Sequence, residues 1–128
     1  MKRLLNLAFL ILLVACLSIS ALADEAVVYL DGTGNTEGAQ TTIQAAVDAL
    51  PDEGGHIIVC GDTATTNTAI TLNAKSGKVK VTAINGAKFT IARTLKFSSE
   101  FEFDDIELVS SSTSMGFLYA KGNKLTFG

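Results

Sequence analysis

Acidic side chains crowd residues 100–107 and are the residue types in this chain best suited to chemistry: Glu100, Glu102, Asp104, Asp105 and Glu107. Carboxylate oxygens are the ligands that Ca²⁺ prefers, and paired carboxylates carry out sugar hydrolysis. Glu102 and Asp104 have the same strand parity and would share a face. The simpler interpretation, which we favour, is a solvated outer face that ends in a corner. Glu102, Asp104, Asp105 and Glu107 stay as candidates for a calcium site, and no catalytic residue is assigned.

A second set of oxygen-bearing side chains lies in "DGTGNTEG", residues 31–38. Asp31, Asn35 and Glu37 superficially suggest a calcium loop, but an EF-hand requires Gly at the sixth position, where Thr36 stands. The segment also lacks the Gly-Lys-Ser/Thr ending of a phosphate-binding loop. We therefore expect a plain turn.

The remaining reactive residue types are sparse. His56 is the single histidine, and the sequence places no nucleophile and orienting acid with it, so we expect a surface or strand-edge residue. Arg93 and Lys96 could contact an anionic sugar, but two isolated cations say little and ordinary surface solubility explains them. Cys60 follows an apolar run and is predicted to be a small buried residue rather than a reactive thiol.

The first 23 residues have the order of a secretory signal peptide. A positive start is followed by an apolar run from Leu4 to Leu17 and by the small-x-small pattern that ends at Ala23. A rival cut lies at Cys16, because residues 13–16 resemble a bacterial lipobox whose cysteine would be lipidated and retained. Simple secretion is preferred, since the apolar region continues beyond Cys16 towards the Ala-x-Ala site.

Residues 24–128 are then one small domain. With Lys2 and Arg3 removed, eight basic and thirteen acidic side chains remain, a net charge of −5. No basic stripe exists to neutralise phosphates, which argues against a nucleic-acid partner. Cys60 is left alone, so no intramolecular disulfide is possible.

One amphipathic helix is predicted near the front, in "AQTTIQAAVDALPDEGG", after a β-prone run at residues 26–30. Thr41 fits as the N-cap and Gln44 completes a capping box. Pro51 ends the helix, and two glycines then let the chain turn. The spacing i, i+3, i+4, i+7 gives one apolar stripe: Ile43, Ala46, Val47 and Leu50.

A degenerate repeat follows the helix. Short β-type runs begin at Ile57, Val79, Phe101 and Leu125, separated by 22, 22 and 24 residues. A second set interleaves with them, beginning at Ile70, Ile91 and Phe117. Two strands per period without an intervening helix predict the stacked turns of a solenoid, a mainly β fold. The helix would seal the first layer, with a cap at 26–50 and coils at 56–128.

The connections favour stacked turns over hairpins. Residues 62–68 and 73–78 lack the tight Asn-Gly signal, and Asn85-Gly86 is the best place for a hairpin. Along "FEFDDIEL" the apolar parity shifts, which predicts a bend at Asp104-Asp105 where the chain turns a corner.

The stretch "VVYLDGTGNTEGAQTTIQAAVDALPDEGGHIIVCGD" resembles the entry to right-handed parallel β-helix proteins of the pectate-lyase-like group. "FEFDDIELVSSSTSMGFLYAKGNKLTFG" is similar to later turns of bacterial surface members. The resemblance implies a parallel β-helix with an N-terminal capping helix, about three coils and a truncated end. The family holds polysaccharide lyases, glycoside hydrolases and non-catalytic surface proteins, and none of its catalytic motifs maps onto this chain.

We therefore expect a secreted or cell-surface β-solenoid module without an evident catalytic site, adhesin-like or structural. Its expected partner is a polysaccharide or cell-wall glycan, and the C-terminal strand edge is expected to promote self-association. The alternative is the N-terminal fragment of a polysaccharide lyase or glycoside hydrolase that acts on acidic glycans. A small independent lipoprotein anchored at Cys16 is the third interpretation.

Overall fold

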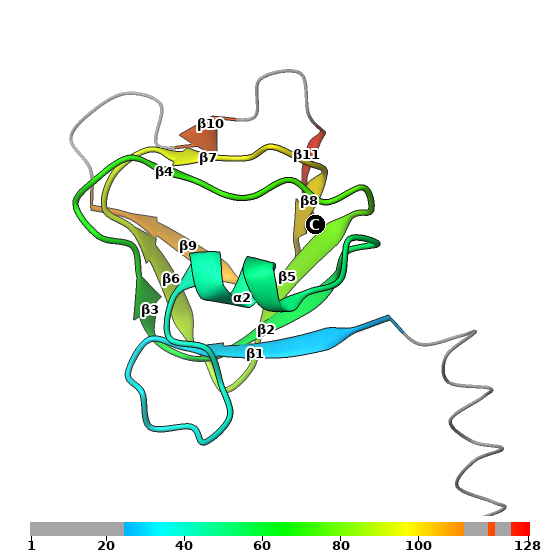
Figure 1. Ribbon diagram of the computed structural model, residues 1–128. Helices are drawn as coiled ribbons and strands as arrows, with labels where there is room; N and C mark the ends of the chain where they lie inside the picture. The colour runs from blue at the N-terminus through cyan, green and yellow to red at the C-terminus, as the bar shows by residue number, and fades with distance from the viewer. Residues whose placement is uncertain (1–24, 112–117, 120–123) are drawn as a thin grey trace, which may run out of the picture.

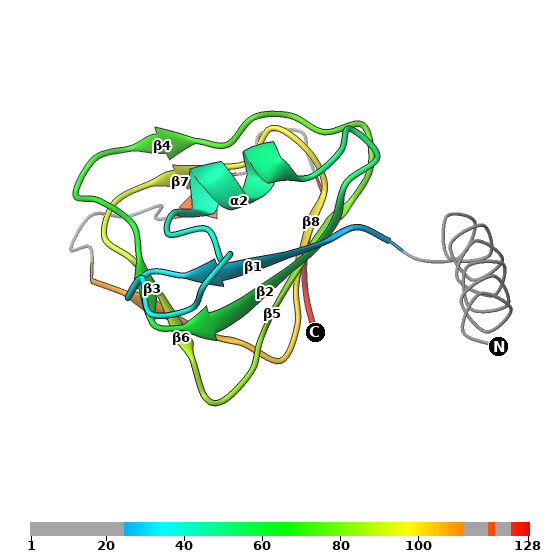
Figure 2. The ribbon, with the colours of Figure 1, turned by 60° about the horizontal axis from the view of Figure 1, so that its bottom comes forward.

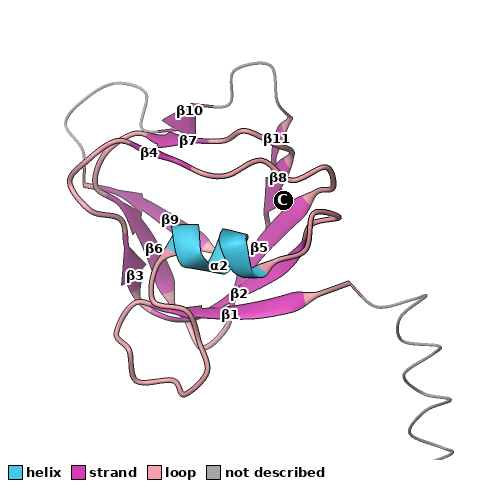
Figure 3. Ribbon diagram, viewed as in Figure 1, coloured by secondary structure: helices cyan, strands magenta, loops and turns pink. Residues whose placement is uncertain are grey.

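The computed structural model describes residues 25–111, 118–119 and 124–128. Within these residues the protein is mainly β, with parallel sheets and one helix (Figures 1 and 3). The widest sheet has the strand order β1-β2-β5-β8-β11, and every neighbouring pair in it is parallel. Its strands are β1 (Val27–Asp31), β2 (Gly55–Gly61), β5 (Val79–Ala83), β8 (Phe101–Phe103) and β11 (Leu125–Phe127).

Two three-stranded parallel sheets complete the described fold. One has the order β3-β6-β9 and the other β10-β7-β4. Strands next to one another in these sheets are three apart in chain order, so the chain visits the three sheets in turn and the predicted parallel pairing is confirmed. The strands are β3 (Thr63–Ala64), β6 (Lys88–Ile91), β9 (Glu107–Ser110), β4 (Ile70–Thr71), β7 (Leu95–Lys96) and β10 (Leu118–Tyr119).

The register of the five-stranded sheet follows the predicted spacing between β5, β8 and β11 and differs from it between β2 and β5. Gly55 lies opposite Val79, which lies opposite Phe101 and then Leu125. The prediction that Ile57 aligns with Val79 is therefore wrong by two residues. Because side chains alternate with a period of two, this slip leaves the inward-facing set unchanged.

The second predicted set of strands groups residues that lie in different sheets. Ile70 pairs with Leu95, whereas Ile91 belongs to β6 in the β3-β6-β9 sheet. The sequence therefore indicated two strands per period where the structure has three. Strands of two residues, such as β3 and β4, are too short to show alternation. Phe117, the predicted start of the last member, lies outside the described residues.

The turn at residues 84–87 contains Asn-Gly but makes no hairpin. Asn85 and Gly86 have φ of 57° and 69°, and the Ala87 N–H donates to the Ile84 carbonyl at 3.1 Å. These positive angles are what a type I′ turn requires. The turn joins β5 to β6, which lie in different sheets, so it serves as a corner. The predicted bend at Asp104-Asp105 is likewise confirmed, because Asp105 has φ of 48° between β8 and β9.

The helix α2 spans Ile43–Ala49, close to the predicted range, with a different N-cap. The Thr42 side chain accepts a hydrogen bond from the Ala45 N–H at 3.1 Å. The predicted Thr41–Gln44 capping box is therefore wrong by one position. Thr42 lies directly before the helix and has the extended backbone conformation that an N-cap residue adopts.

The apolar stripe of α2 is buried as predicted. Ile43, Ala46, Val47 and Leu50 are at most 3% exposed and belong to the same core cluster as Leu30 and the inward residues of the sheets. Figures 1 and 2 both show α2 between β1 and β4, the first strands of two of the sheets. The helix therefore covers apolar side chains at the N-terminal end of the core.

Polar contacts fasten the end of α2 to residues 73–77. Asn73 Nδ2 donates to Asp48 Oδ1 at 2.7 Å, and Lys75 Nζ donates to the Leu50 carbonyl at 2.7 Å. Ser76 Oγ donates to Asp52 Oδ2 at 2.6 Å. That hydrogen bond lowers the pKa of the Asp52 carboxyl. The Lys75 contact satisfies a carbonyl that the helix end leaves open, and the other two bind side-chain carboxylates.

One buried hydroxyl leads to a stability prediction. Ser99 is 5% exposed, and its Oγ has no hydrogen-bond partner among the described residues. Burying an unpaired hydroxyl costs about 1–3 kcal/mol. We expect Ser99→Ala to raise the free energy of unfolding by about 1 kcal/mol in urea denaturation. Ser76→Ala is the matched control and should lower it, because Ser76 bonds to Asp52; a loss in both variants would contradict the prediction.

Candidate functional site

The acidic side chains at residues 100–107 form ion pairs with lysines of neighbouring strands. Glu102 lies 2.6 Å from Lys78, which precedes β5, and the other pairs have N···O distances of 3.6–3.8 Å. The hydrogen bond between Lys78 and Glu102 raises the pKa of the lysine and lowers that of the carboxyl. The remaining pairs are Lys80–Asp104, Lys88–Glu107 and Lys124–Glu100.

Because of these ion pairs, carboxylates that are close in the sequence are directed at different lysines. Glu102 and Asp104 each face a different lysine, so they are not aimed at a common point between them. Asp105 occupies the corner instead, where its carbonyl accepts from the Ala83 N–H at 3.4 Å. In the described part of the chain, no group of three or more His, Cys, Asp or Glu side chains is placed to hold a metal ion. Calcium at these residues stays a prediction from sequence.

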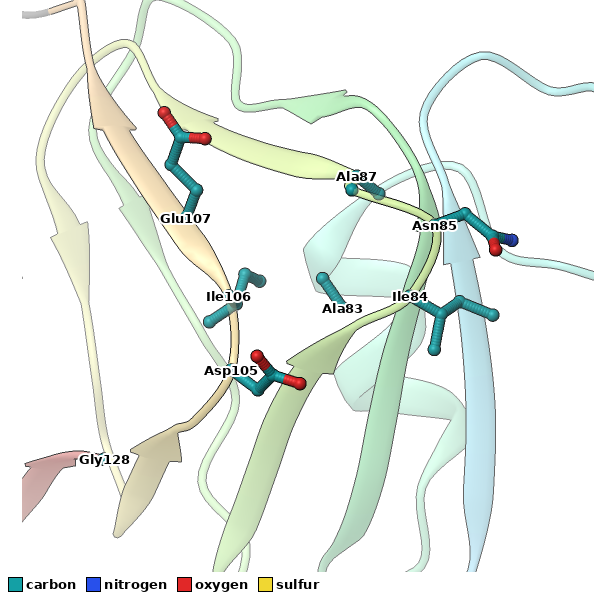
Figure 4. A pocket seen from close by; sticks show the side chains of 9 residues that line it. Ala83, Ile84, Asn85, Ala87, Asp105, Ile106, Glu107 and Gly128 are labelled. Carbon is teal, nitrogen blue, oxygen red and sulfur yellow. The ribbon is translucent and has the colours of Figure 1, made fainter.

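An open depression of about 700 Å³ lies at this corner (Figure 4). Asn85 and Asp105 are its exposed polar side chains nearest the two turns, and Glu107 stands on β9. Figure 4 shows the Asn85 amide directed away from the Asp105 carboxylate, and Glu107 is committed to Lys88. The polar groups therefore do not converge on a ligand position.

The outward face of the five-stranded sheet carries the other candidate residues. Val27 and Tyr29 on β1 are each 48% exposed, and Tyr29 lies in register with Ile58 and Thr82. Such an exposed tyrosine offers a flat apolar ring with a polar end.

His56 lies on this face, but not at an edge. It is half-buried on β2, a strand between β1 and β5, so of the two expected placements the strand edge is wrong and the surface fits. Its Nε2 and the Thr82 Oγ1 are 2.7 Å apart, and its Nδ1 lies 3.8 Å from Glu25. The ring lies between a threonine hydroxyl and an exposed carboxylate, which is the order of groups in a hydroxyl–histidine–acid set, but the 3.8 Å separation from Glu25 exceeds hydrogen-bond length.

Comparisons with known proteins identify no relative. No family model matches the chain, no curated protein matches it, and no solved structure matches it. The resemblance to the pectate-lyase-like group therefore depends on the sequence pattern alone. Within the described residues, no helix has the length and apolar character needed to cross a membrane.

Cys60 is placed differently from the prediction. It is half-buried, with Sγ 3.6 Å from the Leu30 carbonyl and 3.7 Å from Thr36 Oγ1. Alternation along β2 buries Ile57 and Val59, so Cys60 must face outward. The apolar run before Cys60 suggested a fully buried residue, because the alternation of inward and outward side chains along the strand was not taken into account. Arg93 and Lys96 are exposed, as expected of ordinary surface cations.

The sequence interpretation missed the burial of Asp31. This residue is 3% exposed, and its Oδ1 accepts hydrogen bonds from the Thr33 N–H at 2.9 Å and the Thr33 hydroxyl at 2.5 Å. Its Oδ2 accepts from the Thr36 hydroxyl at 2.6 Å. The Asp-x-Thr spacing was the available signal, since Asp commonly bonds the backbone two residues on. Asp31 is therefore an internal anchor of the loop, whereas Asn35 and Glu37 are exposed.

This anchor predicts a pH dependence. The hydrogen bonds from Thr33 and Thr36 lower the pKa of Asp31 to about 2 from its ordinary value of 3.8. A carboxyl with a lowered folded-state pKa stabilises the protein above its unfolded pKa, and that contribution is lost as the pH falls through the folded pKa. We expect the thermal midpoint of the wild type to fall between pH 4 and pH 2, and Asp31→Asn to show a lower midpoint at pH 7 and a shallower fall.

Glu37→Gln, an exposed change in the same loop, is the control and should keep the wild-type pH profile. Parallel profiles for the wild type and Asp31→Asn would contradict the role given to Asp31.

Proposed function

We propose that residues 24–128 form a right-handed parallel β-helix of the pectate-lyase-like kind, with α2 as its cap. This architecture is supported by the order in which successive strands of the chain join the three parallel sheets, one after another. The stacking of inward residues supports it as well, since Val79 lies opposite Phe101 and Phe101 opposite Leu125. Each turn buries its apolar side chains only when a neighbour stacks on it, which suits an elongated and resistant module.

We propose further that this module is secreted or displayed at the cell surface, with an adhesin-like or structural role. The order of residues 1–23 supports the location. The lysine–carboxylate pairs between neighbouring strands support the structural role, because four of the five carboxylates at residues 100–107 lie beside a lysine. Individually, such exposed pairs contribute little to stability.

The location is tested at the N-terminus of the protein from its own cells. Simple secretion gives a mature chain that begins at Asp24, and mass spectrometry of that terminus would show it. A lipidated Cys16 as the first residue would replace free secretion by a membrane-anchored surface protein. A retained Met1 with protein found inside the cell would refute the proposal.

We propose a polysaccharide or cell-wall glycan as the partner of the outward face around Tyr29. A sugar ring stacks on an aromatic face, and His56 and Thr82 supply hydrogen-bonding groups beside it. Co-sedimentation with insoluble wall polysaccharides would measure binding. Tyr29→Ala should reduce the bound fraction about tenfold or more, whereas Lys96→Ala, on a different sheet, should leave it unchanged.

The alternative is the front part of a polysaccharide lyase or glycoside hydrolase that acts on acidic glycans. The exposed Tyr29 face serves this alternative equally well. The gene sequence beyond the codon for Gly128 separates the two. Further coils with clustered Asp or Arg on one exposed sheet would favour the enzyme, whereas anchoring or repeat segments would favour the surface protein.

A further inference from the structure

The strand β11 presents an edge without a paired strand in the described part of the fold. It pairs with β8 on one side and ends the sheet order on the other. The Lys124 carbonyl and the Gly128 N–H bond to β8, at 3.0 and 2.8 Å. Since the peptide groups of a strand alternate in direction, those of Leu125 and Phe127 point to the open side. Phe127 is 56% exposed, although its ring stacks on Phe103.

We propose that this edge binds a second copy of the chain, antiparallel and centred on Thr126. In that register Leu125 lies opposite Phe127 of the second copy, and Phe127 lies opposite its Leu125. Both residues have open N–H and C=O groups, so each opposite pair exchanges two hydrogen bonds. The same register places an apolar side chain beside an apolar side chain on both sides of the axis. The edge is thus self-complementary in hydrogen bonds and in packing.

The opposite end of the sheet argues against a head-to-tail stack. There, β1 is already engaged on its outer side, where Asp31 N–H donates to the Gln40 carbonyl and the Gln40 N–H donates to the Tyr29 carbonyl, both at 2.8 Å. The helix α2 covers the apolar side chains at that end (Figure 2). A twofold pairing of the β11 edge closes after two chains. This inference depends on the stacked architecture proposed above.

Edge prolines test the pairing. Proline at position 125 removes an open N–H without removing a hydrogen bond to β8. Sedimentation equilibrium of the purified protein should give a concentration-dependent dimer for the wild type and a monomer for Leu125→Pro. Val27→Pro is the matched control, because the N–H of Val27 points away from β2 by the same alternation, and it should leave the dimer intact.

A cross-link keeps the test decisive if Leu125→Pro does not fold. In the proposed register the two Thr126 residues form a non-hydrogen-bonded pair with Cα atoms about 4.5 Å apart. That separation lies within the range of about 4.4–6.8 Å spanned by a disulfide. Thr126→Cys in a Cys60→Ser background should oxidise to a disulfide-linked dimer, whereas Thr71→Cys, exposed on β4 at the α2 end, should not.

Each outcome decides the matter. A dimer that Leu125→Pro abolishes and Thr126→Cys captures supports the proposal. A folded wild-type monomer, an open-ended polymer, or a dimer that Val27→Pro abolishes would overturn it. None of these results touches secretion or glycan binding, which are measured by the mature N-terminus and by co-sedimentation.

Discussion

Phe101→Ala is expected to lower the free energy of unfolding by about 3–5 kcal/mol. Phe101 is fully buried on β8, between Val79 on one neighbouring strand and Leu125 on the other. Its ring also lies 4.8 Å from that of Phe97, centroid to centroid. Removing it leaves a cavity beside two strands and Phe97, and urea denaturation followed by far-UV circular dichroism would measure the loss.

The control is Phe127→Ala, the same change in the same sheet. Phe127 is 56% exposed and keeps one stacked partner, so we expect a loss of about 1 kcal/mol. Phe101→Leu, which conserves most of the volume, should cost about 1.5 kcal/mol or less and stays measurable if the alanine variant does not fold. Equal losses at positions 101 and 127 would show that the inward row is not packed as described.

Gly77→Ala is expected to cost about 3 kcal/mol or more. A methyl group at this position would lie 1.7 Å from the Glu53 carbonyl oxygen and 2.4 Å from its carbon. Both obstacles are backbone atoms, so no side-chain rotation relieves the clash. The Gly77 and Ser76 N–H groups donate to the Asp52 carbonyl at 3.1 and 2.8 Å, and these bonds would be strained as well.

Gly34→Ala is the matched control for this change. Gly34 has φ of 75° and open space where a methyl group would stand, so its cost is the backbone strain alone, about 1–2 kcal/mol. The thermal midpoint of the two variants, compared with the wild type, measures the difference. If Gly77→Ala were as mild as Gly34→Ala, residues 53 and 77 would have to separate without loss, and the attachment of α2 to residues 73–77 would be unimportant for stability.

Much of the candidate site depended on pairing that no local pattern reveals. The lysine partners of Glu102 and Asp104 lie one strand away in space but far away in sequence, so the predicted solvated acidic face carried no ion-pair partners. A strand edge was one expected place for His56 because its neighbouring strands were unknown. Both points concern the surroundings of a residue and not its local conformation.

The sequence by itself determined the local features of this protein: the apolar stripe of α2, the inward parity of Phe101 and Phe103, and the bend at Asp104-Asp105. Each is a short-range consequence of helix or strand periodicity and of turn geometry. Only the tertiary structure decided the two-residue register, the third sheet, the burial of Asp31 and the outward position of Cys60. These depend on which distant strands meet, and that choice is made by the combined packing of the whole core.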